Sequence, residues 1–159
     1  TLTAPNGGEH WAGGSSQTIT WTADDITDTN LKTNPITLSY STDSGSTWTQ
    51  IATGETNDGS YDWTVPAIDS ATVRVKVEAT DKAGNTASDE SDADFTIDST
   101  KPTATVAVSD DLISDNNLDQ TITITYDEAM DTNVEPTVTI TRLTSSYTLT
   151  GGTWNTEGT

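Results

Sequence analysis

Carboxylates are the side chains best suited to chemistry in this chain, because 25 Asp and Glu residues stand against 6 Lys and Arg residues and give a net charge of -19. The chain has one His and no Cys, so a zinc site built from imidazole and thiolate ligands is excluded. Calcium instead takes about six to eight oxygen ligands from carboxylates, amides and carbonyls. The segments 81–85 and 110–117 are rich in such oxygens, although neither matches the EF-hand loop in full. The candidate calcium ligands of the second segment are Asp110, Asp111, Asp115 and Asn117.

A second chemical pattern is the stretch STDSGSTW at residues 41–48, which has the Ser-x-Asp-x-Gly-x-x-Trp spacing of the Asp-box found in sialidase-like propeller blades. A propeller repeats its blade every ~40–50 residues, whereas this motif occurs once. A sialidase-like site also needs several arginines to hold a carboxylate, and the chain has only two. We therefore predict a local role, in which Asp43 accepts backbone N–H bonds, Gly45 adopts a positive φ, and Trp48 packs over the hairpin.

The remaining residues predict no catalytic activity. Two carboxyl groups that flank a glycosidic bond can hydrolyse it, but among so many acids no pair stands out. A Ser-His-Asp triad would need His10, which lies in a Gly-rich loop where a polar residue is ordinary.

The net charge also excludes classes of partner. Phosphate recognition needs clustered Lys or Arg, so nucleic acid is excluded as a partner, and anionic membrane surfaces are disfavoured. The sequence contains no apolar run long enough to cross a bilayer, so no membrane insertion is expected. Two explanations of the acidity stay open, namely solvation of the surface in a salty medium and binding of divalent cations.

Short alternating runs separated by turn residues dominate the first part of the chain, and no helical period persists. The clearest run is 73–79, in which Val faces inward and charge outward. The predicted strands lie at 1–4, 17–21, 36–40, 48–51, 60–65, 73–79 and 95–97. Seven short strands of this kind predict an all-β fold, an antiparallel β-sandwich of the immunoglobulin or fibronectin type III kind, over residues 1–99.

A second unit is expected at residues 100–159, after a linker at 98–102 in which Pro102 stops strand continuation. Its predicted strands lie at 105–108, 121–126, 137–141 and 147–150. A sandwich needs about seven strands, so we expect the second immunoglobulin-like unit to be incomplete in this chain. Either the chain is a piece of a longer protein, or another chain supplies strands to the open edge by strand complementation.

The junction between the two expected sandwiches is the main predicted metal site. In such an arrangement the linker lies near a loop of the first domain and near the B–C loop of the second. Carboxylates that meet there repel one another unless a cation lies between them. The predicted calcium ligands at the junction are Asp69, Asp98, Asp127, Glu128 and Asp131.

Four patches resemble a known family. Residues 5–11 (PNGGEHW) resemble the opening of immunoglobulin-like repeats of exported microbial surface proteins, and residues 79–86 (ATDKAGNT) resemble the late hairpin of such repeats in large adhesins. Residues 98–102 are similar to the junction between repeats, and 123–130 look like a second strand and the loop after it. The resemblance implies tandem domains of adhesins, surface layers or extracellular enzymes, often stiffened by calcium.

The function expected from these observations is a structural or spacer repeat at the cell surface or outside the cell, with neighbouring repeats of the same protein as partners. Two alternatives stay open, a glycan- or protein-binding module and an accessory domain of a secreted hydrolase. A sugar-stacking surface would use exposed indole rings, although alternation assigns Trp21 and Trp63 to the core. The candidate rings are Trp11, Trp48, Trp63 and Trp154.

Overall fold

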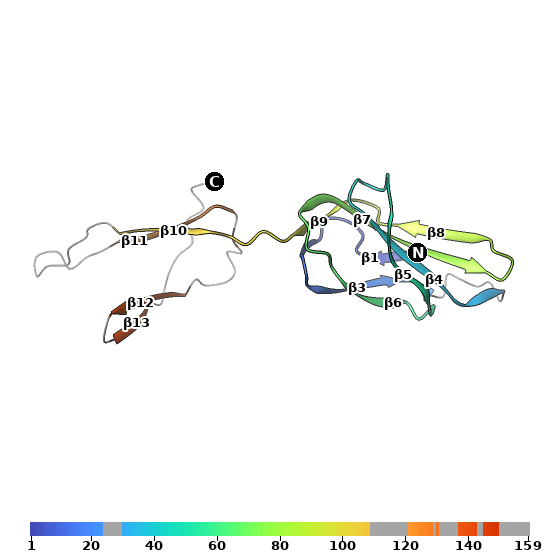
Figure 1. Ribbon diagram of the computed structural model, residues 1–159, viewed down its shortest axis with the longest axis horizontal. Helices are drawn as coiled ribbons and strands as arrows, with labels where there is room; N and C mark the ends of the chain where they lie inside the picture. Colours follow the sequence, from blue (N-terminus) through green and yellow to red (C-terminus); the bar gives the residue numbers. More distant parts are fainter. Residues whose placement is uncertain (24–29, 109–120, 129, 131–136, 143–144, 150–159) are drawn as a thin grey trace, which may run out of the picture. The chain divides into compact units, whose positions relative to one another are not determined.

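The computed structural model describes residues 1–23, 30–108, 121–128, 130, 137–142 and 145–149 (Figure 1). The chain divides into two compact units, unit 1 at Thr1–Thr100 and unit 2 at Lys101–Thr159. The described residues form strands and turns with no α-helix, which confirms the predicted all-β class. Within them, no helix is long and apolar enough to cross a membrane.

The smaller sheet of unit 1 has three antiparallel strands in the order β1-β3-β6. They are β1 (Leu2–Ala4), β3 (Ser16–Trp21) and β6 (Ser60–Thr64). Because β3 alternates with period two, Ile19 and Trp21 are buried while Thr20 between them remains partly accessible.

The larger sheet has six strands, with the order β2-β9-β7-β4-β5 and with β8 paired to the second half of β7. The strands are β2 (His10–Ala12), β9 (Phe95–Asp98), β7 (Ser70–Asp81), β4 (Leu31–Ser41), β5 (Thr49–Glu55) and β8 (Thr86–Glu90). All pairs are antiparallel except β2 with β9, which is parallel. The expectation of a purely antiparallel sandwich is therefore wrong at this one pair.

The apolar residues of both sheets form one core, which gives unit 1 a β-sandwich-like character. On β7, Val73 and Val75 are fully buried while Arg74 and Lys76 alternate outward, as the sequence predicts. Burial of each larger side chain contributes about 1.5–3 kcal/mol. The buried hydrophobic residues are Leu2, Ile19, Trp21, Ile36, Leu38, Ala52, Trp63, Val65, Val73, Val75, Val77, Ala79, Phe95 and Ile97.

Unit 2 contains two antiparallel strand pairs among its described residues, β10 with β11 and β12 with β13. Their bounds are Ala104–Val108, Ile122–Tyr126, Val138–Arg142 and Ser145–Leu149. None of the side chains described here is buried, and Val106 and Val108 are 65% and 51% exposed. Whether unit 2 is an incomplete sandwich, and whether another chain completes it, stay predictions.

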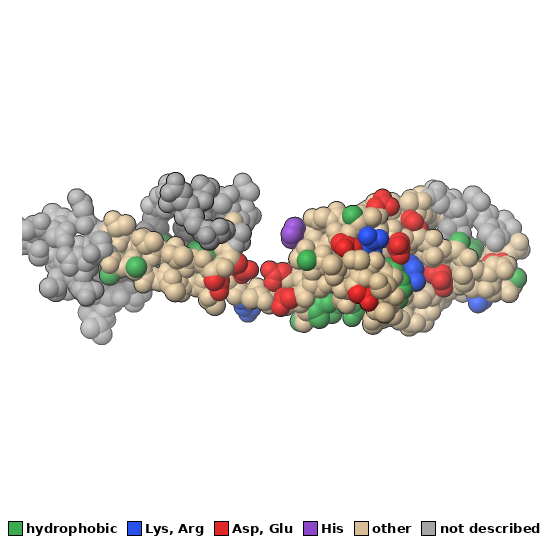
Figure 2. All heavy atoms as spheres, turned by 90° about the horizontal axis from the view of Figure 1, so that it is seen from above, with side chains coloured by type: hydrophobic (Ala, Val, Ile, Leu, Met, Phe, Trp, Pro, Cys, Tyr) green, Lys and Arg blue, Asp and Glu red, His purple; other side chains and the backbone are tan. Residues whose placement is uncertain are grey.

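The acidic side chains of unit 1 are spread over the face seen in Figure 2, with a few basic side chains among them. His10 is exposed, but it is the first residue of β2, so its predicted position within a loop is wrong. The charge of unit 1 is thus dispersed over this face, and the polar contacts described next are mostly pairs and short networks.

Candidate functional site

The Asp-box stretch forms a hydrogen-bonded turn between β4 and β5. Oδ1 of Asp43 accepts bonds from Ser41 Oγ at 2.7 Å and from Thr47 N at 2.8 Å, while Oδ2 accepts one from Thr47 Oγ1 at 2.7 Å. These donors, led by the Ser41 hydroxyl, lower the pKa of Asp43 to about 2. The carboxylate is therefore engaged as an acceptor within its own turn, as predicted for a local role.

The backbone of this turn also follows the prediction. Gly45 has a φ of 89°, and Ser44 before it has a φ of 55°. An added Cβ at Gly45 would lie 3.4 Å from the Trp48 ring, so the indole packs against the turn. The Nζ of Lys76 lies 4.3 Å from the Trp48 ring centroid, which is cation–π geometry. One face of this indole is thus occupied by a side chain of the protein.

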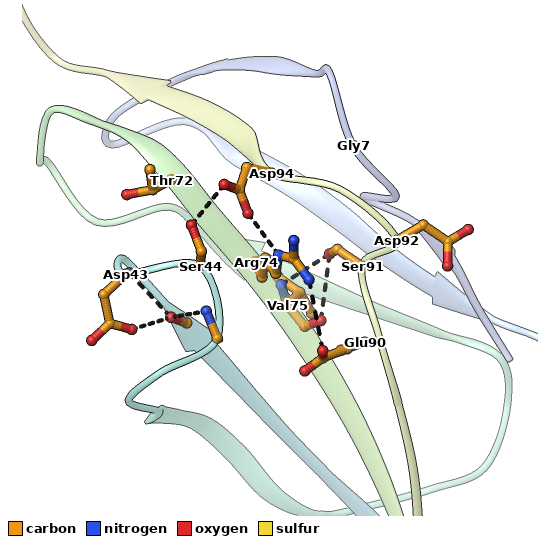
Figure 3. A network of polar contacts seen from close by, with 12 residues as sticks. Gly7, Asp43, Ser44, Thr72, Arg74, Val75, Glu90, Ser91, Asp92 and Asp94 are labelled. Carbon is orange, nitrogen blue, oxygen red and sulfur yellow. Dashed lines mark hydrogen bonds and ion pairs between the residues drawn. The ribbon is translucent and has the colours of Figure 1, made fainter.

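Asp94 connects the turn to Arg74 on β7 (Figure 3). Arg74 Nε donates to Oδ1 of Asp94 at 2.6 Å, and Oδ2 of Asp94 accepts from Ser44 Oγ at 2.7 Å. Glu90 Oε1 lies 3.7 Å from Arg74 Nη1. The hydrogen bond from Arg74 is the main reason why the pKa of Asp94 is lowered, and the Asp94 carboxylate raises the pKa of Arg74. The guanidinium is therefore already paired within the fold.

Ser91 lies where β8 ends and β9 has not begun, and its side chain is fully buried (Figure 3). Its hydroxyl accepts a bond from Val75 N at 3.0 Å and donates to the Pro5 carbonyl at 2.8 Å. The Ser91 N–H donates to the Val75 carbonyl at 2.9 Å. One hydroxyl thus links the N-terminal loop to the centre of the larger sheet.

The two ends of unit 1 are joined along their length, and we call residues 5–13 and 91–98 together the terminal clasp. Its backbone bonds run from Gly8 N to Asp94 O at 3.0 Å, from Thr96 N to Glu9 O at 2.9 Å, and from Gly13 N to Asp98 O at 2.8 Å. The parallel β2–β9 pair lies within the terminal clasp.

Side chains complete the terminal clasp at its first loop. The Asn6 amide pairs at both ends with Asp92: Asn6 Nδ2 donates to Asp92 Oδ2 at 2.8 Å, and Asp92 N donates to Asn6 Oδ1 at 3.0 Å. Glu9 turns back on the loop and accepts from Asn6 N at 2.8 Å and from Gly7 N at 2.9 Å. The sequence contains no sign of this pairing, because the partner residues 91–98 lie at the other end of unit 1.

Of the predicted calcium ligands, Asp69 and Asp98 are brought together at the end of unit 1. Both accept from the N–H of Thr100, at 3.2 Å and 2.8 Å, and Asp69 Oδ1 also accepts from Ser99 N at 2.6 Å. The Ser99 bond is the largest cause of the lowered pKa of Asp69. These two carboxylates thus accept the backbone N–H bonds of Ser99 and Thr100, and both side chains are otherwise exposed to solvent.

The other predicted ligands are in unit 2 or outside the described residues. Asp127 accepts bonds from the N–H and hydroxyl of Thr103, which lower its pKa, and Glu128 lies in the bend after β11. Within the described part of the chain, no three His, Asp or Glu side chains group closely enough to hold a metal ion. The positions that lie outside the described residues are Asp110, Asp111, Asp115, Asn117 and Asp131. Calcium binding stays a prediction.

The candidate sugar-stacking rings do not form one exposed platform among the described residues. Trp21 and Trp63 are buried, as predicted, and Trp11 packs on Trp63 and Phe95 with ring centroids 6.2 Å and 5.0 Å away. Trp48 is covered on one face by Lys76, and Trp154 lies outside the described residues.

Comparison with known proteins gives no match: no protein-family profile, curated protein or solved structure matches this chain.

Proposed function

We propose that this chain is a non-catalytic structural or spacer segment of a secreted or cell-surface microbial protein, and that unit 1 is an immunoglobulin-like β-sandwich. The sheet order supports this assignment. Immunoglobulin-type domains place strands A, B, E and D in one sheet and C, F and G in the other. Here β1, β3 and β6 form one sheet, while β4, β7 and the successive pair β8 and β9 belong to the other.

The observation that carries the spacer role is the terminal clasp. In the parallel β2–β9 pair, His10 is opposite Thr96 and Ala12 is opposite Asp98. A pull that separates the two ends of unit 1 acts on these strands in opposite directions along their length. The hydrogen bonds between them are then loaded together in shear, whereas bonds pulled perpendicular to the strands break one after another. Such an arrangement suits a segment that transmits tension along the chain.

The use of the acidic side chains supports the same role. Asp58 and Asp81, like Asp43, accept hydrogen bonds from donors within their own turns, and these bonds lower the pKa of each. In the 81–85 turn, Asp81 Oδ1 accepts from Ala83 N at 2.9 Å and from Asn85 N at 2.7 Å. The acids of these turns thus stabilise connections between strands, and the net charge of -19 keeps the surface solvated.

Stretching of single molecules held at their two ends tests the proposal. Forced unfolding reports the unfolding rate. Because the hydrogen bonds of the β2–β9 pair are loaded together, we expect unit 1 to unfold under tension in one cooperative event. Asn6→Ala removes the side-chain pairing with Asp92 and should lower the unfolding force. Asp58→Ala is the matched control, because it removes turn hydrogen bonds outside the terminal clasp. Equal effects of the two substitutions, or unit 1 extending without a resolved event, would contradict the spacer role.

A further inference from the structure

The loop that begins the terminal clasp contains the dipeptide Asn6–Gly7, the only Asn-Gly pair in the chain. Asn followed by Gly is the sequence most prone to deamidation, because a glycine offers little steric hindrance to attack of its own backbone nitrogen on the Asn side chain. Packing restricts position 7 to glycine here. Its φ is 123°, and an added Cβ would lie 2.6 Å from Ala93 Cβ. The fold thus places a chemically labile pair at a position where the glycine cannot be replaced cheaply.

Both reacting groups are held in the closed terminal clasp. The Asn6 amide is fixed at its two ends by Asp92, and the Gly7 N–H, the attacking nitrogen, donates to Glu9 Oε2 at 2.9 Å. A fourth bond, from Ala93 N to Asn6 O at 3.3 Å, fixes the backbone between them. Attack on Cγ needs the amide to rotate and the Gly7 nitrogen to lose its proton, so these bonds must break first.

We infer that Asn6 is a deamidation site, and that the hydrogen bonds of the closed terminal clasp protect it from the reaction. When the terminal clasp opens transiently and Asn6 deamidates, the product prevents the terminal clasp from closing again. The deprotonated Gly7 nitrogen bonds to Asn6 Cγ, a succinimide ring closes, and the side-chain nitrogen leaves as ammonia. Water then opens the ring to give aspartate or isoaspartate. No oxidant, reductant or other protein is needed.

The product cannot remake the bond that Asn6 Nδ2 donates to Asp92, although its carboxylate can still accept from the Asp92 N–H. Asn6 Nδ2 donates to Asp92 Oδ2 at 2.8 Å, and after deamidation an oxygen of a second carboxylate takes the place of that donor. Two carboxylates at this distance repel each other, and Glu9 adds a third negative charge to the same loop. The isoaspartate product also lengthens the backbone between residues 6 and 7. This inference concerns the chemistry of the loop and does not depend on the spacer role.

Peptide mapping by mass spectrometry tests whether the terminal clasp protects Asn6 from deamidation. The intact chain is incubated at mildly alkaline pH beside a synthetic peptide of residues 1–15, and conversion at Asn6 is followed by the mass change from amide to acid. Because conversion requires local opening, we expect it to be slower in the folded chain by at least about tenfold. Asp92→Ala should speed conversion at Asn6, and Asp58→Ala, at a turn outside the terminal clasp, should not. Conversion at the peptide rate in the intact chain, or equal acceleration by both variants, would show that the terminal clasp does not protect Asn6.

Two substitutions of Asn6 test whether a negative charge at this position keeps the terminal clasp from closing. Asn6→Ala and Asn6→Asp both remove the donor to Asp92, but only Asn6→Asp adds a charge, and only Asn6→Asp keeps an acceptor for the Asp92 N–H. We expect Asn6→Asp to have the lower melting temperature, with the difference reduced at high salt because screening weakens repulsion between exposed charges. If Asn6→Asp melts at or above the temperature of Asn6→Ala, repulsion does not outweigh the retained Asp92 N–H bond, and the inference that the charge keeps the terminal clasp open is overturned. The wild-type mapping remains decisive even if Asn6→Asp does not fold.

Discussion

Ser91 offers the sharpest test of the packing of unit 1, because a single buried hydroxyl satisfies two backbone groups from distant segments. Ser91→Ala leaves the Val75 N–H and the Pro5 carbonyl without this partner, and both Ser91 and Pro5 have relative exposures below 2%. An unsatisfied buried polar group costs about 1–3 kcal/mol. The expected loss for the two groups, allowing for some relaxation, is therefore about 2–4 kcal/mol in the free energy of unfolding.

The loss is measured by urea unfolding followed by tryptophan fluorescence, since Trp21 and Trp63 report on the core of unit 1. Ser88→Ala is the control, because Ser88 is exposed on β8 and its truncation should change stability by no more than about 0.5 kcal/mol. The midpoint should shift for Ser91→Ala with an unchanged denaturant slope. If Ser91→Ala and Ser88→Ala have equal unfolding free energies, the buried hydroxyl does not hold the N-terminal loop, and the reasoning is refuted.

Gly7, Asp43 and the predicted calcium ligands each give one further prediction. In thermal unfolding, Gly7→Ala should lower the melting temperature more than Gly8→Ala. Both residues have positive φ, but only a Cβ at position 7 would collide with Ala93. Equal decreases in melting temperature would show that the close approach of Gly7 to Ala93 does not matter for stability. The pKa of Asp43 is about 2 against an ordinary 3.8, so its contribution to stability is complete above about pH 4 and is lost as pH falls through 2. Acid titration of unfolding should therefore show a smaller loss of stability over that window for Asp43→Asn than for wild type, and parallel curves would contradict the lowered pKa. If the predicted carboxylate ligands bind calcium, its addition to chelator-treated protein should release or absorb heat and raise the melting temperature. No heat and no shift in melting temperature, measured in NaCl-matched buffer, would leave surface solvation as the explanation of the acidity.

The strands with regular alternation were predictable from sequence, and the reason is visible on β7. Val73 and Val75 face a core that accepts only apolar side chains, so the pattern of the chain repeats the geometry of the strand. The turn at Asp43 was predictable as well, because its hydrogen bonds join residues within a few positions of one another. Both predictions depend on information that is local in the sequence.

The terminal clasp was not predictable in this way. Strand β2 has three residues between glycine-rich turns, and β8 (TASDE) is almost wholly polar, so neither has an alternating apolar pattern. Ser91 is buried although it lies in a run of Ser and Asp residues. Strand β2 and Ser91 are explained by partners more than 80 positions away, in β9 and Pro5, and a single sequence carries no signal of such pairing. Strand β8 lies outside the terminal clasp and is held by its neighbour β7.

Polar contacts between the two ends of unit 1 thus do the work that a larger apolar core would do in a more hydrophobic domain. Hydrophobic residues make up 31% of the sequence, which is below the usual share for a globular protein. The N-terminal loop compensates through Ser91, Asn6 and Glu9, whose bonds close the sandwich where its two chain ends meet. Because those bonds depend on amide and hydroxyl donors, the stability of unit 1 is sensitive to any chemistry that exchanges a donor for a charge. The same loop is therefore expected to govern both the resistance of unit 1 to a pull on its ends and its loss of stability as the protein ages.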